Sequence, residues 1–124
     1  RVETDAPVGL YLVDKKPLLM VTEDWAFPTL RGLIEHPIPE RRVVVDAGAV
    51  RFVANGADTM RPGIVEISPD VQHGHPVQVV EERHGKPLAV GIALLDAADM
   101  EQQEKGKSVR SVHHVGDDIW NLEV

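Results

Sequence analysis

The front of the chain alternates short apolar runs with polar residues typical of turns. Residues 8–13 and 18–22 are apolar over the length of a strand, and the Asp-Lys-Lys-Pro stretch between them has turn composition. A short helix follows, with Pro28 in its first turn and leucine and isoleucine side chains recurring on one face. Pro37 ends this helix, because a proline disfavours helical geometry in the residue before it. We place a domain boundary near residue 42, after an extended linker.

The middle of the chain predicts a strand, a helix and a turn in quick succession. Residues 43–46 predict a short strand, and Asp46 suits the N-cap position of the helix that follows. Gly56 ends this helix, because glycine readily takes the left-handed backbone conformation. The segment Arg61-Pro62-Gly63-Ile64 fits a type II turn, with proline second and glycine third. The helix presents one apolar face, formed by Ala49, Phe52 and Val53.

The second half of the chain predicts strands at 64–67, 76–83, 87–95, 108–115 and 119–124. His-Gly-Lys joins two of these strands in a tight hairpin, and Gly-Asp-Asp forms the turn before the last one. A short helix capped by Asp96 follows the hairpin. Many short strands with two or three short helices favour a mixed α/β, mainly β, barrel-like domain over a parallel Rossmann-type sheet.

Composition bounds the class of protein. The chain has 124 residues, enough for one domain, and its 43% hydrophobic and 27% charged residues are typical of a globular protein with a core. It holds no cysteine, which excludes a disulfide scaffold, a cysteine nucleophile and a thiolate zinc site. No apolar run approaches the roughly 18 residues of a membrane span, and we find no secretory signal, so we expect a cytoplasmic location. Because the chain begins at Arg1 without a methionine, we expect a fragment of a longer protein.

The net charge of −7 argues against a polyanionic partner, but the charges are unevenly distributed. Residues 65–104 hold eight carboxylates against two basic side chains, whereas residues 31–64 hold five arginines against four carboxylates. Residues 105–116 hold three basic side chains and no carboxylate. Scatter on a solvated surface is one interpretation. The other is a bipolar domain whose two basic segments meet in space.

The usual enzyme motifs are missing from the chain. There is no phosphate-binding loop, no G-x-G-x-x-G and no G-x-S-x-G elbow. Asp117 and Asp118 are adjacent carboxylates, for which we expect a solvated turn and no acid–base role. Surface positions in polar loops explain the histidines better than a metal site, which would need two pairs to converge, His73 with His75 and His113 with His114. We therefore predict no catalytic residue, no metal and no cofactor.

Two arginines and three aromatic residues have both a structural and a functional interpretation. Arg51 lies on the helix away from its apolar face, and Arg61 precedes the Pro-Gly turn, so both should be exposed. Simple solvation explains each of them taken alone. We expect Trp25, Phe27 and Trp120 to belong to the core, and base stacking would require an open ring face.

The sequence VDAGAVRFVANGADTMRPGI at residues 45–64 resembles the signature of the PUA domain, an RNA-binding pseudo-barrel. That signature combines V-D-x-G-A, an apolar helix, G-A-x-x-M and P-G-[IV]. The positions in register are Val45, Asp46, Gly48, Ala49, Gly56, Ala57, Met60, Pro62, Gly63 and Ile64. The resemblance implies a mainly β pseudo-barrel of short strands with two short helices, which binds RNA and is not an enzyme.

The flanking sequences narrow the resemblance. Residues 24–37 and 105–122 resemble the malignant T-cell amplified sequence family, which couples a small pre-PUA region to a PUA domain and acts in translation. This resemblance implies a partial α/β pre-PUA region at 1–42 and a PUA domain at 43–124. From the resemblance we expect the first strand and helix usual in that region to be missing from the front of this sequence. Low lysine with abundant Asp, Glu and Ala suits a salt-adapted archaeal member, whose acidic surface serves solubility.

In PUA domains RNA lies against the groove between the first helix and the second strand, with the last strands nearby. Carried onto this chain, the resemblance implies an RNA-binding face of Arg51, Gly56, Ala57, Asp58, Arg61, Pro62, Gly63, Ile64, Lys105, Lys107 and Arg110. Small residues let a sugar-phosphate chain approach free backbone groups, and Arg61 can pair with a phosphate. The partners implied are structured RNA (tRNA or rRNA), the small ribosomal subunit or a translation factor, without a membrane.

Three alternatives stay open. The chain could be a protein-interaction module that docks a translation factor or ribosomal subunit through exposed apolar and aromatic residues near 25–34. It could be the PUA domain of an RNA-modification enzyme, although the sequence before residue 43 favours the translation family. An enzyme with a histidine-bound metal ranks last. The charge of −7 is the main argument against RNA.

Overall fold

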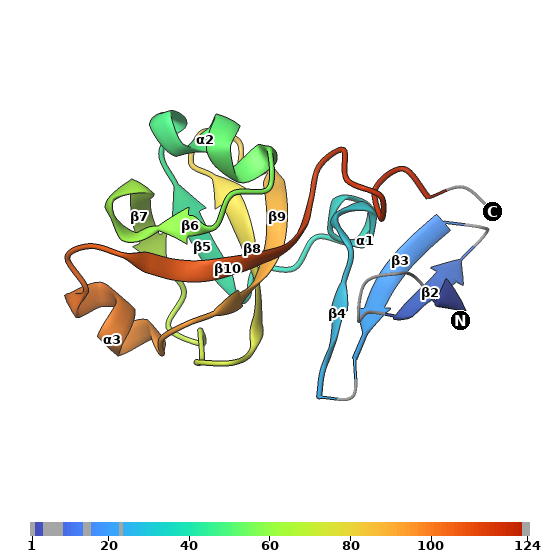
Figure 1. The fold of residues 1–124 in the computed structure, drawn as a ribbon, viewed down its shortest axis with the longest axis horizontal. Helices are drawn as coiled ribbons and strands as arrows, with labels where there is room; N and C mark the ends of the chain where they lie inside the picture. Colours follow the sequence, from blue (N-terminus) through green and yellow to red (C-terminus); the bar gives the residue numbers. More distant parts are fainter. Residues whose placement is uncertain (1, 4–8, 14–15, 23, 123–124) are drawn as a thin grey trace.

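The computed structural model describes residues 2–3, 9–13, 16–22 and 24–122. Its strands form two sheets, which lie side by side along the long axis of the molecule (Figure 1). The first sheet is antiparallel, with strand order β1-β2-β3-β4. Its strands are β1 (Val2–Glu3), β2 (Gly9–Val13), β3 (Lys16–Val21) and β4 (Ala26–Pro28). Residue 8 of the first predicted strand and residues 14–15 of the predicted turn lie outside the described part.

The second sheet has the strand order β6-β10-β9-β8-β5-β7. Its strands are β5 (Arg42–Val45), β6 (Thr59–Met60), β7 (Ile64–Ile67), β8 (Pro76–Glu81), β9 (Pro87–Ala93) and β10 (Lys107–His114). Neighbouring strands pair antiparallel except β5 and β8, which run parallel. The two edge strands, β6 and β7, are joined by one short 3₁₀ turn, η1 (Arg61–Gly63). The sheet therefore curls into a nearly closed pseudo-barrel, which confirms the predicted fold class.

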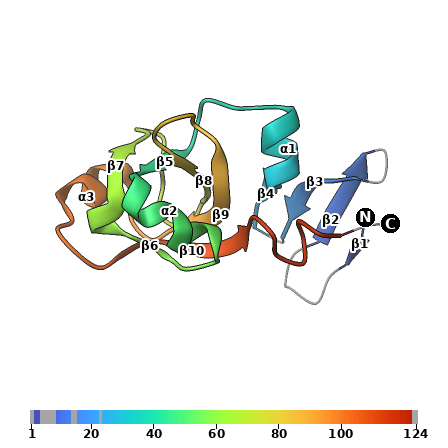
Figure 2. The same ribbon diagram turned by 90° about the horizontal axis from the view of Figure 1, so that it is seen from above.

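Three α-helices flank the sheets: α1 (Leu30–Glu35), α2 (Ala47–Ala54) and α3 (Ala97–Gln102). Helix α2 lies across one end of the barrel strands and α3 at the outer end of the molecule (Figure 1). Helix α1 lies between the barrel and the first sheet, as the view from above shows (Figure 2). The barrel thus carries α2 and α3, and α1 belongs to the junction.

Aliphatic side chains fill the barrel. Strands β8 and β9 are largely buried on both faces because one face lines the barrel interior and the other is covered by neighbouring elements. Burying each such side chain contributes about 1.5–3 kcal/mol. The barrel core comprises Val43, Val45, Val53, Ile64, Ile67, Val71, Val77, Val79, Ala89, Ala93, Met100 and Val109.

A second core joins the two sheets. Leu10 and Met20 of the first sheet and Leu30 of α1 pack in one cluster with Val90 of the barrel and Ile119 of the C-terminal segment. That segment leaves the end of β10 and returns to the first sheet (Figures 1 and 2). The two sheets are therefore held together by apolar packing as well as by the linker before β5.

Local signals in the middle of the chain are confirmed. Asp46 caps α2, and its carboxylate accepts a hydrogen bond of 3.0 Å from the Ala49 amide. Gly56 follows the helix with a φ of 97°, the left-handed conformation expected for a residue that ends it. Strands near 43–46, 64–67, 76–83 and 87–95 are present with small shifts of their ends.

Several local predictions are wrong. Residues 61–63 form a 3₁₀ turn instead of a type II turn, because Gly63 lacks the positive φ that a type II turn requires. The bond from the Ile64 amide to the Arg61 carbonyl is common to both turns. Pro28 ends β4, and Thr29 caps α1 by accepting from the Gly32 amide. Residues 119–122 form turns where a strand was predicted, since Asp117 accepts from the Trp120 amide and captures this segment.

Candidate functional site

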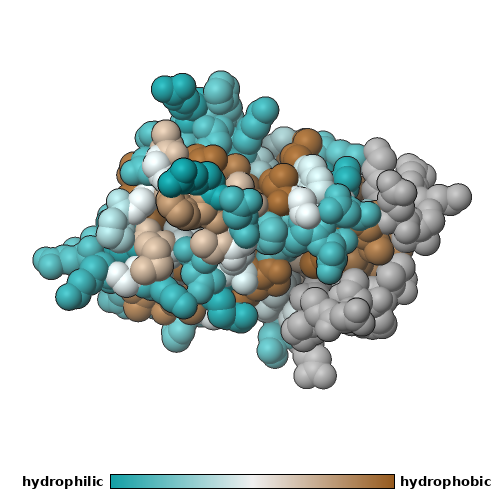
Figure 3. All heavy atoms as spheres, turned by 45° about the horizontal axis from the view of Figure 1, so that its top comes forward, coloured by the Kyte–Doolittle hydropathy of each residue, from teal (hydrophilic) through white to brown (hydrophobic). Residues whose placement is uncertain are grey.

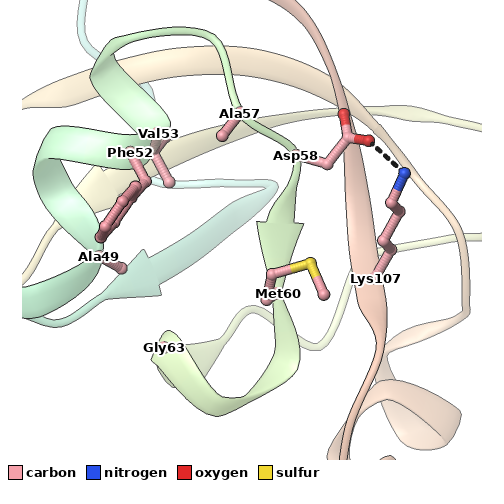
Figure 4. A pocket seen from close by; sticks show the side chains of 8 residues that line it. All are labelled: Ala49, Phe52, Val53, Ala57, Asp58, Met60, Gly63 and Lys107. Atoms are coloured by element: carbon pink, nitrogen blue, oxygen red, sulfur yellow. Dashed lines mark ion pairs between the residues drawn. The ribbon is translucent and has the colours of Figure 1, made fainter.

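A pocket of about 380 Å³ lies between α2 and the neighbouring strands β6 and β10. Figure 4 shows α2 side chains on one side of it and side chains of β6 and β10 on the other. We call it the α2 groove. It is lined by Ala49, Phe52, Val53, Ala57, Asp58, Met60, Gly63 and Lys107.

Small residues form the narrow end of the α2 groove. A Cβ on Gly63 would lie 2.9 Å from the Ala49 Cβ, closer than two such atoms approach. Glycine at position 63 and alanine at position 49 therefore let η1 pack directly against α2. The result is a shallow surface that the backbone of another chain can approach closely.

Two large apolar side chains beside this surface are uncovered. Phe52 is 54% exposed and Met60 is 47% exposed. The predicted apolar face of α2 is thus only partly right: Val53 is buried and Ala49 packs partly against the core, but Phe52 lines the groove. Apolar residues gather over α2 beside hydrophilic ones in the space-filling view, which brings this side forward (Figure 3). An uncovered aromatic ring in a groove is a candidate stacking surface.

An ion pair forms the polar rim of the groove. The Lys107 ammonium lies 3.0 Å from the Asp58 carboxylate, and the Ser111 amide donates to the other Asp58 oxygen at 2.8 Å (Figure 4 shows the ion pair). The hydrogen bond from Ser111 and then the one from Lys107 hold the pKa of Asp58 below its ordinary value. Asp58 therefore stays charged and positions Lys107, whose side chain is 61% exposed.

Arg51 stands next to the groove, as an exposed residue of α2. Its guanidinium carbon lies 4.8 Å from the centre of the Phe52 ring. This contact is a cation–π interaction, worth about 0.5–1 kcal/mol at an exposed site. It places a positive charge beside the ring that lines the groove.

The remaining residues of the predicted face are divided between surface and interior. Arg110 is exposed on β10 and contributes to the low pKa of Asp58, so it lies near the groove, although the Ser111 and Lys107 hydrogen bonds are the larger causes. Lys105 and Pro62 are also exposed. Ile64 is 7% exposed and belongs to the barrel core, so it offers no side-chain surface to a ligand.

Arg61 is not the free phosphate-binding arginine that the sequence suggests. It is half-buried, and its Nε donates to the Met100 carbonyl at 2.8 Å. Its Nη1 donates to the Ile64 carbonyl at 3.1 Å. The guanidinium thus ties η1 to α3, and the prediction that Arg61 is exposed is wrong.

The backbone amides at the end of α2 are also committed. The Gly56 amide donates to the Val53 carbonyl, and the Ala57 amide donates to the Phe52 carbonyl. Both close the C-terminus of the helix. These two amides are therefore not free to bind a ligand, contrary to the expectation from the sequence. The groove offers its small residues, the Phe52 ring and charged side chains instead.

His113 and Asp117 form a hydrogen-bonded pair that does not line the α2 groove. The His113 side chain is 1% exposed, and its Nδ1 lies 2.8 and 2.9 Å from the two Asp117 oxygens. The Leu30 amide donates to His113 Nε2 at 3.2 Å, so the proton of the neutral ring is on Nδ1. The predictions of a surface histidine and a solvated aspartate are wrong here, because α1 covers the end of β10.

Burial alone would raise the pKa of Asp117, but the hydrogen bonds that it accepts from His113, Trp120 and His114 outweigh this effect. The pKa of Asp117 therefore lies below its ordinary value. Asp117 acts as a structural acceptor that fixes the tautomer of His113.

His73 and His75 are exposed in the loop before β8, as predicted from their polar surroundings. Within the described ranges, no three histidine or carboxylate side chains are arranged to hold a metal ion. Across the same part of the chain, every helix is too short or too polar to span a membrane.

Sequence reasoning did not include Phe52 and Met60 among the candidate RNA-contacting residues, although both line the groove. Both stand inside the motif of residues 45–64, but helical periodicity assigned Phe52 to the core. The signal that could have found Phe52 is the surplus of apolar residues around a helix of only eight residues, since so short a helix does not bury all of them. Met60 lies on β6, where no helical periodicity marks it.

The sequence and the fold match one known family. The family model described as the PUA domain matches residues 41–115. The chain therefore belongs to the PUA domain family, as its sequence motif predicted.

Its relatives specify the branch of the family. An uncharacterized protein of Methanocaldococcus jannaschii is 43% identical over 92% of this chain and 70% of its own length. Translation machinery-associated protein 20 of Saccharomyces cerevisiae is 30% identical over 99% of this chain and 71% of its own. A hypothetical protein of the archaeon Pyrococcus horikoshii superposes with a TM-score of 0.87 at 40% identity, covering 99% of this chain and 77% of that one.

Malignant T-cell-amplified sequence 2 of mouse is 32% identical over 78% of this chain and 55% of its own length. The predicted resemblance to the malignant T-cell amplified sequence proteins, with archaeal relatives, is confirmed.

Proposed function

We propose that this chain is a non-catalytic RNA-binding module acting in translation, and that the α2 groove is its RNA contact. The observation that carries the proposal is the uncovered Phe52 ring, which lies in a groove of small residues beside Arg51 and Lys107. Structured RNA, namely tRNA or rRNA free or within the small ribosomal subunit, is the proposed ligand. The site needs no cofactor.

Physical chemistry supports a single-stranded or unpaired element of the RNA at the groove. A nucleobase can stack on the Phe52 ring, which is worth about 1–3 kcal/mol per base. The small residues Ala49, Ala57 and Gly63 let the sugar-phosphate backbone approach closely. Arg51 and Lys107 then offer their charges to phosphates. Together these groups supply binding without bond-breaking chemistry.

The acidic net charge is compatible with this proposal because of where the carboxylates lie. Eight of them fall in residues 65–104, outside the groove lining, whose single carboxylate is Asp58. Asp58 is neutralised by its ion pair with Lys107. The same pair offsets the charge of Lys107, so Arg51 and the nearby Arg110 give the rim its net positive charge, and the chain as a whole stays acidic. This distribution supports the two-segment basic face inferred from the sequence.

The names of the relatives support a place in translation, since a yeast relative is a translation machinery-associated protein. We infer from this a cytoplasmic site of action. We further propose that residues 1–42 form part of a pre-PUA region and residues 43–124 the PUA domain. The first sheet and the barrel sheet support this division, although Ile119 packs with the first sheet.

The proposal is tested by charge reversal at the groove. In a fluorescence titration with a tRNA transcript, Arg51→Glu and Lys107→Glu should each weaken binding by about tenfold. Lys86→Glu is the matched control, since Lys86 is exposed but does not line the α2 groove. Equal affinities for all four proteins would refute the proposed face. Retention on nuclease-treated small subunits, but not on RNA, would favour the protein-interaction alternative.

That second candidate is favoured by one observation on α1. Ile34 is 52% exposed, which is a large uncovered aliphatic side chain within the region that sequence analysis assigned to partner binding. Ile34 lies outside the lining of the α2 groove, so such a contact would use a different surface.

A further inference from the structure

A second pocket, of about 440 Å³, lies at the junction of the two sheets and shares no lining residue with the α2 groove. It is bounded by α1, the linker before β5, the β8–β9 hairpin and the C-terminal segment. We call it the junction pocket. Its walls include Leu33, Ile34, Ile38, Pro87, Leu88 and Trp120.

The walls of the junction pocket are held in place by hydrogen bonds. Gln78 Nε2 donates to the Ile38 carbonyl at 3.0 Å and to the Glu40 carbonyl at 2.8 Å, which fixes the linker. The Arg31 guanidinium donates to the Trp120 carbonyl at 3.0 and 2.8 Å and lies 4.6 Å from the centre of its ring. The pocket is therefore preformed, as ligand pockets usually are.

The apolar surface at its rim is uncovered. Ile34 is 52% exposed, and Trp120 is only partly buried. A large aliphatic side chain beside an accessible indole costs solvation free energy unless a partner covers both. The pocket thus has room and apolar surface for one bulky side chain.

All the titratable side chains that line the pocket are basic ones, although the chain carries a net charge of −7. They are Arg42, His84 and Lys86. Glu81, at the end of β8, turns its carboxylate toward its own hairpin, where it accepts from the amides of residues 83, 84 and 86 at 2.7–3.1 Å. It also lies 3.7 Å from His84 Nδ1, where it offsets the charge of a protonated His84, so Arg42 and Lys86 are the positive charges that the lining keeps.

Arg42 has unused hydrogen-bonding capacity. Its Nη2 makes one long contact, 3.4 Å, with the Gly85 carbonyl, and its Nε has no hydrogen-bond partner. Among the described residues, none of the ion pairs involves Arg42. Gly85 has a φ of 67°, and a Cβ there would lie 3.3 Å from Arg42 Nη2, so glycine leaves space for the guanidinium. A guanidinium that has no carboxylate partner in a pocket with apolar walls can form charge-assisted hydrogen bonds with an anionic ligand.

We propose that the junction pocket binds an acidic peptide segment of a partner protein. The segment inserts one bulky apolar side chain between Ile34 and Trp120 and pairs a neighbouring carboxylate with Arg42, while Lys86 attracts further acidic residues. Such a segment bridges α1 and the barrel hairpin, so it contacts both sheets at once.

The chemistry of the walls favours a peptide over a nucleic acid. Trp120 and the exposed imidazole of His84 are the aromatic rings in the lining, and its apolar residues other than Trp120 are aliphatic or proline. Aliphatic walls suit a leucine, isoleucine or phenylalanine side chain, whereas unpaired bases are usually held between aromatic rings or guanidinium planes. On a chain with a net charge of −7, an acidic partner is attracted to basic surfaces such as this one, and the aliphatic walls favour a peptide here.

The test selects ligands for the whole chain from a displayed library of random dodecapeptides. The selected peptides should share a bulky apolar residue next to Asp or Glu. In fluorescence polarisation, Ile34→Glu and Lys86→Glu should each lower the affinity of the protein for the best synthetic peptide by about tenfold. Arg42→Gln should weaken the acidic peptide but leave unchanged the binding of its Glu→Gln analogue.

Matched controls exist for both surface changes. Val65→Glu places the same new charge at another 52% exposed aliphatic residue, and Arg83→Glu reverses an exposed charge of the same hairpin outside the pocket. Both should bind the peptide like the unchanged protein. Selected peptides without a shared apolar–acidic pattern, or affinities that ignore Ile34 and Lys86, would overturn the proposal. The proposal would also be overturned if the unchanged protein bound a single-stranded RNA oligonucleotide and the Ile34→Glu variant did not.

Discussion

Phe52 lies among apolar residues of α2, yet its ring is 54% exposed and lines a groove. Neighbouring Val53 is 2% exposed and belongs to the barrel core. Adjacent residues of one helix thus divide between the barrel core and the surface of the α2 groove. A substitution at Phe52 should therefore affect ligand binding without a large effect on stability.

Replacing Phe52 by alanine should weaken RNA binding by about 5- to 150-fold, the loss of about 1–3 kcal/mol of stacking. The free energy of unfolding should change by no more than about 1 kcal/mol, because the ring is mostly in solvent and its contact with Arg51 is weak. Titration with tRNA and urea unfolding measure the two effects. Val65→Ala, an equally exposed apolar site on β7, should leave RNA affinity unchanged. A stable Phe52→Ala variant with full RNA affinity would show that the ring takes no part.

The protonation of Asp117 changes the free energy of unfolding, because its carboxylate is held by hydrogen bonds in the folded protein. Its pKa in the folded protein lies below the ordinary 3.8, so its contribution is complete above the unfolded-state pKa. That contribution is lost as the pH falls through the lower, folded-state pKa. The cause is the loss of the carboxylate that accepts from His113 and two backbone amides.

We expect Asp117→Asn to lower the free energy of unfolding by about 1–3 kcal/mol at neutral pH. The deficit should be constant above about pH 5 and narrow as the pH falls below the ordinary carboxylate pKa. Urea unfolding at several pH values measures it. Asp118→Asn is the control, since Asp118 is exposed next to it. A deficit that widened on acidification would contradict the assignment.

At the scale of elements, local chemistry predicted the start and end of α2. The Asp46 cap and the left-handed Gly56 require no knowledge of distant residues. The environments of Arg61 and His113 could not be predicted in this way. Arg61 reaches the end of α3, and His113 accepts from α1 across 83 positions of sequence. Exposure of a side chain depends on such partners, which periodicity does not contain.

Gly56 joins the end of α2 to β10. A Cβ at this position would lie 2.8 Å from the His114 ring, and the φ of 97° is already unfavourable for other residues. Gly56→Ala therefore combines backbone strain of about 1–2 kcal/mol with a steric cost of about 1–3 kcal/mol.

Gly74→Ala separates the two costs, because Gly74 has a φ of 83° and nothing within 4 Å of the added carbon. In urea unfolding, Gly56→Ala should lose more stability than Gly74→Ala. It should also weaken RNA binding, since β10 carries Lys107 at the groove rim. Equal losses of stability in the two variants would mean that the His114 contact is unimportant.

At the scale of the whole molecule, the two pockets lie in different structural contexts. The α2 groove belongs to the barrel, whereas the junction pocket requires both sheets and the C-terminal segment. The motif at residues 45–64 predicted the first, because the groove is built mainly from that stretch. No single stretch encodes the second, since its lining residues run from position 33 to position 120. Sequence reasoning found apolar residues near 25–34 but not the basic hairpin that completes the pocket.

The central claim is that RNA contacts the α2 groove. Its most direct test is photo-crosslinking of the unaltered chain to a 4-thiouridine-labelled tRNA transcript, with the crosslinked residues identified by mass spectrometry. We expect the crosslinks to fall on Phe52, Met60 and the neighbouring residues of α2 and β10. Crosslinks confined to the junction pocket or to the carboxylate-rich residues 65–104 would contradict the account.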